Sequence, residues 1–248
     1  MTAHGERILV LSPRGNCLIA GFFPATTMPD PDWWQALWPE PAKILAAMGV
    51  QAGMVAVDLC CGDGLFTAPL ARIAKRVHAI DIDPAMLDRA RALLAAEGAA
   101  NCHFVLADAM AVDAVVPEPV DYVLLANTFH GVPDQRGLAC AVAATLKADG
   151  QFGIVNWHRR PRAETVVLGQ PRGPKTEMRI EPDEVAAIAE TAGLVANRMV
   201  KLPPYTDLRK FLCMSVVSFS SHGTIAGGTY RAGKAGAQAT AQSERIRR

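Results

Sequence analysis

The chain has 248 residues, of which 50% are hydrophobic and 20% are charged, and its 25 basic and 24 acidic residues leave a formal net charge of +1. A chain of this length can bury one large core, so we expect one main domain. The balanced charge gives no reason to expect a nucleic acid or an anionic membrane as partner. No apolar run reaches the roughly 18 residues of a membrane span, so no membrane partner is expected.

The six cysteines are scattered and form no C-x-x-C pair. Their spacing matches neither a disulfide framework nor a zinc site, so we expect no bound metal and a reducing, cytoplasmic location. The cysteines are Cys17, Cys60, Cys61, Cys102, Cys140 and Cys213.

The chain divides into three parts by composition. Residues 1–27 carry a short apolar segment that is broken by Pro13 and Arg14, which is poor for a signal peptide, and we expect them to be a peripheral segment. The composition changes just before the tryptophan-rich stretch "PDPDWWQALWPEP", so the main domain is predicted to span residues 28–222. Residues 223–248 have almost no large apolar side chains and are predicted to be a disordered tail.

Beyond Pro39, short apolar runs alternate with longer runs of helical period. This alternation predicts an α/β fold of the doubly wound, Rossmann-like type, with a mostly parallel seven-stranded sheet and helices on both faces. The second helix is the clearest, because Asp83 can cap it and Pro84 suits its first turn. The predicted strands are residues 54–60, 76–82, 102–108, 120–127, 151–157, 194–202 and 210–221, and the predicted helices are residues 65–76, 84–98, 134–150 and 181–193.

The stretch "VDLCCGDG", residues 57–64, places two glycines between the first strand and the first helix. Glycines at such a turn let a ligand approach backbone N–H groups at the start of a helix. Asp81 and Asp108 end the next two strands. Because parallel strands end at one edge of a sheet, these carboxylates are expected to face one crevice.

These motifs, in this order, resemble those of the class I methyltransferases that use S-adenosylmethionine, and the resemblance extends from about Trp33 to Tyr205. It implies S-adenosylmethionine as the cofactor. It also implies that the first motif holds the methionine part, that "HAIDID" holds the ribose and that "LADAM" holds the adenine. One departure is Cys60, which stands where the family more often has its first glycine and should narrow the loop. The cofactor-binding residues implied are Asp58, Cys60, Gly62, Gly64, Asp81, Ile82, Asp108, Ala109 and Asn127.

Other interpretations of the same residues exist. Asp58 could satisfy turn amides and Asp81 could lie on the surface. A nicotinamide-binding domain also needs a glycine turn, but its third glycine would fall at Thr67, and Asp108 would have no role. A Pro-Pro-aromatic motif occurs at residues 203–205 rather than directly after the fourth strand, which argues against the enzymes that methylate amino groups of DNA or of glutamine.

The catalytic candidates follow the fourth strand, in "ANTFHG". His130 could take a proton from an acceptor, although it could equally be a structural histidine. Asn127 suits the methionine end or a turn better than the chemistry, and Phe129 could line the acceptor pocket. Trp34 could stack on a flat acceptor, although Trp33, Trp34 and Trp38 are better explained as anchors of an N-terminal helix.

The fifth strand is followed by a long connection rich in arginine, proline and glycine. Long loops at this edge of a sheet are often lids or binding loops. We expect His158, Arg172 and Arg179 to contact the acceptor, with the arginines favouring an anionic one. A solvated basic surface loop is an equally good interpretation.

Three functions are consistent with the sequence. The favoured one is transfer of a methyl group from S-adenosylmethionine to a nucleophilic O, N, S or C atom of a small, anionic acceptor. The alternatives are a methyltransferase that acts on protein or RNA, and a non-catalytic domain that binds S-adenosylmethionine and regulates a partner. The near-neutral charge argues against RNA, and the sequence indicates no oligomeric state.

Overall fold

The computed structural model describes residues 29–201 and 214–220 of the chain. Several predictions lie outside the described residues: the peripheral segment 1–27, the tail 223–248, the Pro-Pro-aromatic motif at 203–205, residue 202 of the sixth predicted strand, and residues 210–213 and 221 of the last one.

A seven-stranded sheet forms the centre of the molecule, in the order β3-β2-β1-β4-β5-β9-β8. Neighbouring strands from β3 to β5 run parallel, whereas β9 is antiparallel to both β5 and β8. The chain order reverses between β1 and β4, which is the point where ligands bind in sheets of this kind. The prediction of a mostly parallel sheet is confirmed. The strands are β1 (Val55–Leu59), β2 (Arg76–Asp81), β3 (Cys102–Leu106), β4 (Val120–Ala126), β5 (Leu146–Trp157), β8 (Val195–Lys201) and β9 (Met214–Ser220).

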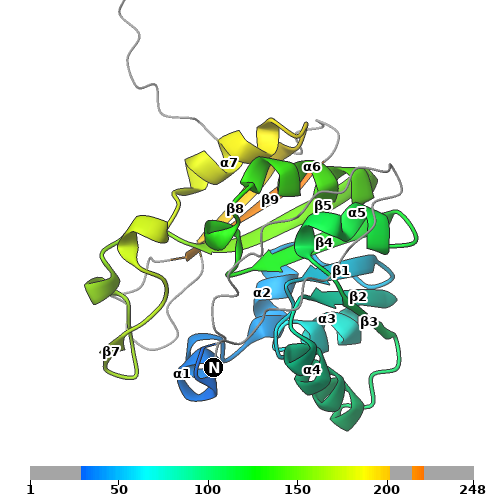
Figure 1. Cartoon of the computed structure of the whole chain (residues 1–248), viewed down its shortest axis with the longest axis horizontal. Helices are drawn as coiled ribbons and strands as arrows, with labels where there is room; N and C mark the ends of the chain where they lie inside the picture. The colour runs from blue at the N-terminus through cyan, green and yellow to red at the C-terminus, as the bar shows by residue number, and fades with distance from the viewer. Residues whose placement is uncertain (1–28, 202–213, 221–248) are drawn as a thin grey trace, which may run out of the picture.

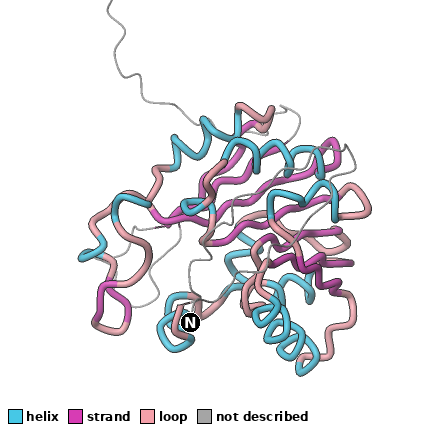
Figure 2. Tube along the Cα trace, in the orientation of Figure 1, coloured by secondary structure: helices cyan, strands magenta, loops and turns pink. Residues whose placement is uncertain are grey.

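Helices cover both faces of this sheet, as Figures 1 and 2 show. The four helices α1–α4 pack on one face, where their side chains share a core with Ala56, Tyr122 and Leu124. The three helices α5–α7 pack on the other face, against Val57 and Val123. The strands therefore bury both faces, which explains their continuous apolar sequence. The helices are α1 (Pro31–Leu37), α2 (Pro41–Ala47), α3 (Thr67–Ile73), α4 (Pro84–Ala96), α5 (Val112–Val115), α6 (Gln135–Thr145) and α7 (Pro182–Glu190).

Helix α4 begins as its sequence predicts. The side chain of Asp83 accepts a hydrogen bond of 2.8 Å from the backbone N–H of Ala85, and Pro84 occupies the first turn. Leu87, Ala90 and Leu94 form its buried face. The helix therefore closes the space beyond the glycine turn and β2.

The boundary between α6 and β5 differs from the predicted one. The sequence predicts a helix over residues 134–150, but α6 ends at Thr145 and β5 begins at Leu146. Leu146 pairs with Val120 of β4, and the register then shifts before Tyr122. Pairing with β4 thus extends the strand over residues that would suit a helix, because tertiary contacts override weak local preference.

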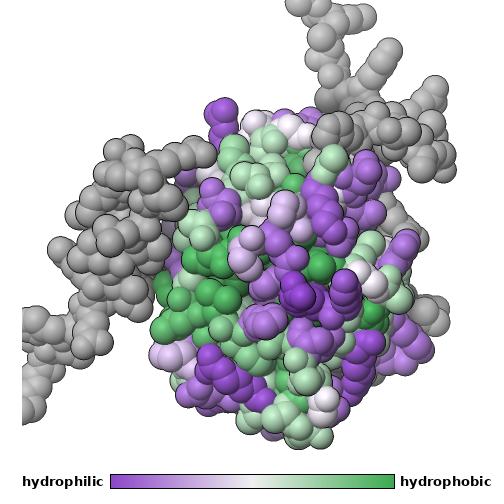
Figure 3. Space-filling model, turned by 90° about the vertical axis from the view of Figure 1, so that its right-hand side faces the viewer, coloured by the Kyte–Doolittle hydropathy of each residue, from purple (hydrophilic) through white to green (hydrophobic). Residues whose placement is uncertain are grey.

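The tryptophans at the start of the domain are anchors, as predicted. Trp33, Trp34 and Trp38 are all buried, and Trp38 makes an edge-to-face contact with Phe66 at 5.3 Å between ring centroids. They fix α1 against the sheet near the carboxyl ends of its parallel strands (Figure 1). Viewed from the opposite edge, where the parallel strands begin, polar and apolar residues are mixed over the face (Figure 3). None of the described helices is both long and apolar enough to cross a membrane.

Candidate active site

A cavity of about 680 Å³ lies at the carboxyl ends of the five parallel strands β1–β5. The turns after these strands supply its floor, and α1 and the connection after β5 supply its walls. That connection contains two short helices, η3 (Arg162–Glu164) and η4 (Thr176–Met178), and a small hairpin of β6 (Val166–Val167) and β7 (Gln170–Pro171). The hairpin lies on the same side of the sheet as α1 in Figure 1.

Three residues of the glycine turn after β1 adopt the left-handed backbone conformation. Gly62 and Gly64 have positive φ angles of 55° and 91°, and Cys60 has the same handedness at 59°. A side chain at Gly64 would meet the backbone of Ala90 at 3.0 Å, so this glycine allows the turn to pack on α4 and does not line the cavity. Cys60 and Gly62 do line it. Of the two predicted cofactor-binding glycines, one therefore faces the cavity and the other supports the turn.

Hydrogen bonds to the carboxylate of Asp81 connect the glycine turn to the end of β2. One carboxylate oxygen accepts a hydrogen bond of 2.8 Å from the backbone N–H of Gly62, and the other accepts one of 2.9 Å from Asp83. Burial raises the pKa of the Asp81 carboxyl, and both backbone hydrogen bonds act against this. Asp81 and Ile82 line the cavity, where each carboxylate oxygen keeps a lone pair for a ligand hydroxyl.

Asp58, at the end of β1, is buried on the cavity floor and is only 2% exposed. Its carboxylate accepts a hydrogen bond of 2.6 Å from the hydroxyl of Thr67 in α3. The pKa of Asp58 is raised to about 7, mainly by burial; the hydrogen bond from Thr67 acts to lower it, and the charges of Asp81 and Asp63 act to raise it. A cationic ligand group in the cavity would favour the ionised form. Thr67 was singled out in the sequence only as a missing glycine, and its contact with Asp58 was not foreseen.

Asp108 and Ala109 lie after β3 and line the same cavity. One carboxylate oxygen of Asp108 accepts a hydrogen bond of 2.9 Å from the N–H of Met110, so Asp108 caps the short helix η1 (Ala109–Ala111). The predicted residues at the ends of three strands are thus brought together.

Asn127, directly after β4, has an unsatisfied side chain. Its backbone has a positive φ of 62°, and its N–H donates to the carbonyl of Val155 at 2.8 Å. Both polar atoms of its side-chain amide are buried, and neither has a hydrogen-bond partner among the described residues. Buried amides rarely stay unpaired, so a polar ligand in the cavity that Asn127 lines is the expected partner.

His130 lines the cavity on the neighbouring turn. Its Nδ1 lies 2.9 Å from the side-chain oxygen of Asn156, a residue of β5 that is 3% exposed. Burial lowers the pKa of His130, the contact with Asn156 raises it, and the charge of Arg179 lowers it. Since an amide oxygen can only accept, this contact favours the tautomer with the proton on Nδ1, which leaves a lone pair on Nε2. The sequence places Asn156 at a strand end but does not reveal this contact across two strands.

Arg179 does not line the cavity, in contrast to its predicted role. Its side chain is fully buried and lies over the ring of Trp157 at 5.1 Å. The guanidinium donates to the carbonyls of Pro174 and Arg160, both at 3.1 Å, and to the hydroxyl of Thr165 at 2.8 Å. It therefore holds the connection after β5 together from inside.

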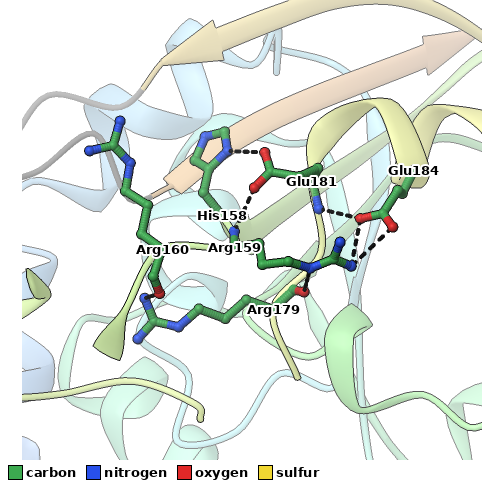
Figure 4. Close-up of polar contacts among 6 residues, drawn as sticks. All are labelled: His158, Arg159, Arg160, Arg179, Glu181 and Glu184. Carbon is green, nitrogen blue, oxygen red and sulfur yellow. Dashed lines mark hydrogen bonds and ion pairs between the residues drawn. The ribbon is translucent and has the colours of Figure 1, made fainter. Parts of the chain in front are cut away.

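The base of this connection is a group of ion pairs, drawn in Figure 4. The guanidinium of Arg159 contacts the carboxylate of Glu184 at 2.8 Å, and its backbone N–H donates to Glu181 at 2.9 Å. His158, another predicted acceptor contact, lies with its Nδ1 3.5 Å from Glu181 and does not line the cavity. Glu181 and Glu184 also form the capping box of α7, so both ends of the connection are fixed at one helix start.

The remaining predicted acceptor residues divide between core and cavity. Phe129 is fully buried among apolar side chains of the sheet and of α6, and it does not line the cavity. Trp34 and Arg172 do line it, together with Trp33 and Arg162. The tryptophan rings of α1 and the arginines of the connection after β5 thus line the same end of the cavity.

Comparisons with known proteins agree with this geometry. A family model described as a methyltransferase domain matches residues 56–150. The ubiquinone biosynthesis O-methyltransferase of Stutzerimonas stutzeri is 30% identical over 174 residues, which cover 66% of this chain and 74% of that protein. Its counterpart of Xanthomonas euvesicatoria is 28% identical over 180 residues, which cover 65% and 75%.

Solved structures with the same fold include a SAM-dependent methyltransferase from Aquifex aeolicus. It has a TM-score of 0.62 and 22% identity, over 78% of this chain and 94% of that one. The 1,6-didemethyltoxoflavin-N1-methyltransferase of Burkholderia thailandensis, solved with bound 1,6-didemethyltoxoflavin and S-adenosylhomocysteine, has a TM-score of 0.55 and 21% identity, over 77% of this chain and 81% of that one.

Proposed function

The chain belongs to the class I S-adenosylmethionine-dependent methyltransferases, and we propose that it methylates a hydroxyl oxygen of its small-molecule acceptor with His130 as general base. The methyl group of S-adenosylmethionine is activated by the positive sulfur to which it is attached. The protein's task is to align the acceptor, exclude water and, where the acceptor is a hydroxyl group, remove its proton.

The residues of the cavity suit the cofactor. S-adenosylmethionine carries a cationic sulfonium and an ammonium group, and three carboxylates, Asp58, Asp81 and Asp108, line the cavity after β1, β2 and β3. We assign the methionine part to the turn of Asp58, the ribose to Asp81 with Ile82, and the adenine to Asp108 with Ala109. The unpaired amide of Asn127 supports a polar ligand at the methionine end.

The observation that carries the choice of oxygen is the His130–Asn156 pair. A hydroxyl group must lose its proton during transfer, and a buried neutral imidazole with its Nε2 free can take it. Asn156 holds the other ring nitrogen, so the imidazole keeps one orientation. The names of the two O-methyltransferase relatives support the same acceptor atom. We also propose a reducing, cytoplasmic location, as the spacing of the cysteines in the sequence favours.

The test combines cofactor binding with product analysis. We expect the purified protein to bind S-adenosylhomocysteine and to convert a phenolic acceptor to its methyl ether. His130→Gln should lower kcat by about a hundredfold or more and leave S-adenosylhomocysteine affinity unchanged. His103→Gln is the matched control, since His103 is exposed on β3 and does not line the cavity.

Two outcomes would contradict the proposal. One is a product methylated only on nitrogen, sulfur or carbon across a panel of acceptors. The other is an O-methylation rate that His130→Gln leaves at the level of the unchanged protein.

A further inference from the structure

The charges that line the cavity differ between its two ends, although Arg89 of α4 also lines the end that holds the carboxylates. The carboxylates follow β1, β2 and β3, and we call this end, with Asp58, Asp81 and Asp108, the cofactor half. The arginines Arg162 and Arg172 lie in the connection after β5, and we call that end, with His130, the acceptor half. A cationic cofactor suits the first half, whereas the second half favours a ligand group of negative charge.

Arg172 is held rigidly at the cavity wall by its backbone. Its N–H donates to the carbonyl of Thr165 at 2.8 Å, and its own carbonyl accepts hydrogen bonds from the hydroxyl of Thr165 at 2.8 Å and from Arg179 at 3.3 Å. Arg179 is itself fully buried. The fully buried arginine thus fixes the position from which Arg172 extends.

The guanidinium of Arg172 has an aromatic neighbour but no acidic one. It lies over the ring of Trp33 in α1, at 5.5 Å from the centroid. Its Nε is buried and has no hydrogen-bond partner among the described residues. None of the ion pairs of the described chain includes it. A partly desolvated cation without a counter-ion attracts an anion strongly.

The other arginines near it are already engaged. Arg159 pairs with Glu184, and the Nε of Arg162 donates to the carbonyl of Gly173 at 3.0 Å. Arg179 makes its hydrogen bonds inside the connection. Arg172 is therefore the cavity-lining arginine of this connection whose Nε has no hydrogen-bond partner within the described chain.

We propose that Arg172 is a specificity-determining residue that binds a carboxylate group of the acceptor, with Trp33 holding the guanidinium in place. Guanidinium and carboxylate match in geometry and can form two parallel hydrogen bonds. The acceptor is then a small hydroxy acid, whose hydroxyl lies at His130 and whose carboxylate lies at Arg172. This inference rests on the proposed function for the hydroxyl group, but the carboxylate contact is tested by binding alone.

The experiment compares three probes that differ in one group. They are 3,4-dihydroxybenzoate, its neutral amide 3,4-dihydroxybenzamide, and catechol, which lacks the substituent. Each is titrated by calorimetry into the full-length protein saturated with S-adenosylhomocysteine, and each is then assayed for methylation with S-adenosylmethionine. The variants are Arg172→Gln and, as matched control, Arg160→Gln. Arg160 lies on the same connection with an exposed side chain that does not line the cavity (Figure 4).

We expect the unchanged protein and Arg160→Gln to bind the acid about tenfold to a hundredfold more tightly than the amide, as a charge-assisted hydrogen-bonded pair should give. Arg172→Gln should lose this preference and keep its affinity for S-adenosylhomocysteine and for the amide. Arg172→Lys should restore only part of the preference, because an ammonium group cannot bind in the paired geometry.

Equal affinity of the unchanged protein for acid and amide would overturn the inference, as would a preference that survives Arg172→Gln. No measurable binding of the acid to the S-adenosylhomocysteine complex would also overturn it. Failure of the proposed function looks different: the acid binds through Arg172, but no methyl ether forms or His130→Gln does not slow its formation.

Discussion

The cofactor half and the acceptor half of the cavity are held by different kinds of interaction. In the cofactor half, the carboxylates of Asp81 and Asp108 accept hydrogen bonds from backbone N–H groups: Gly62, in the turn after the neighbouring strand, donates to Asp81, and each carboxylate also accepts from the residue two positions later. In the acceptor half, His130 depends on Asn156 of another strand, and Arg172 depends on Arg179 and Thr165 of the same long connection. Backbone hydrogen bonds at the strand ends therefore define the cofactor site, whereas the acceptor site depends on which side chains pack together and can change with one substitution.

Among the variants that test this difference between the two halves, we expect the largest effect from Arg179→Met. The substitution removes charge-assisted hydrogen bonds to buried carbonyls and to Thr165, so we expect the free energy of unfolding to fall by about 2 to 4 kcal/mol. KM for the acceptor should rise, while affinity for S-adenosylhomocysteine in the folded protein stays the same. Denaturant unfolding and calorimetry measure the two effects.

Arg159→Met is the control for that variant. Arg159 is half exposed and pairs with Glu184, so its loss should cost no more than about 1 kcal/mol. If Arg179→Met weakened cofactor binding as much as acceptor binding, the two halves would not be independent.

Asp81→Ala should be the most damaging change in the cofactor half. It removes the ribose contact that we propose and also the acceptor of the Gly62 N–H that shapes the turn. We expect the Kd for S-adenosylmethionine to rise about a hundredfold, the size expected from losing a charge-assisted hydrogen bond and its support. Asp81→Asn, which keeps one carbonyl oxygen, should show a smaller rise. Calorimetry that finds equal affinity in the alanine variant and the unchanged protein would disprove the assignment.

Asn156→Leu should affect the acceptor half alone, by about tenfold in kcat, because one hydrogen bond orients the imidazole. The pH profile distinguishes this positioning role from a structural one. The contact with Asn156 raises the pKa of His130, so its removal should lower that pKa further. The low-pH limb of kcat/KM should then move to lower pH in Asn156→Leu, and to higher pH in Asn156→Asp, where a carboxylate favours the imidazolium. An unmoved limb in both variants would exclude His130 as the titrating base.

The smallest effect is expected for Thr67→Val. Asp58 is largely protonated below its raised pKa of about 7, and the cationic cofactor favours the ionised form, so affinity should rise with pH through that value and then level off. The Thr67 hydroxyl stabilises the ionised carboxylate. Its removal should shift this rise to higher pH and weaken binding a few-fold at neutral pH. Thr67→Ser keeps the hydroxyl and is the control.

Proton release on binding provides a second measurement of the same effect. Titrations in two buffers of different ionisation enthalpy count the protons released when S-adenosylmethionine binds. More protons should be released by Thr67→Val than by the unchanged protein near neutral pH, since more Asp58 is protonated before binding. An equal count in both proteins would mean that Asp58 does not ionise on binding.

The amino-acid sequence by itself determined the fold and the cofactor half. The apolar strands, the helix cap at Asp83, the glycine turn and the acids after β2 and β3 are short-range patterns, and parallel strands bring their ends to one edge whatever the details of packing. The sequence did not reveal the short helices α2 and α5 or the contact of Thr67 with Asp58. It also missed the extension of β5 to Leu146, because pairing with Val120 overrode a local preference for helix.

The tertiary structure alone decided the acceptor half. In the sequence, Arg172 and Arg179 are two similar arginines, yet one reaches the cavity beside Trp33 and the other is buried beneath the connection. Phe129 and His158 also follow strands, but the side chain of Phe129 lies in the core and that of His158 lies beside Glu181. No local pattern specifies these differences, because they depend on which carbonyls, rings and carboxylates lie within reach of each side chain once the chain has folded. The positive charges that could bind an acceptor could be read from the sequence, but only the fold shows that the buried Nε of Arg172 has no hydrogen-bond partner among the described residues.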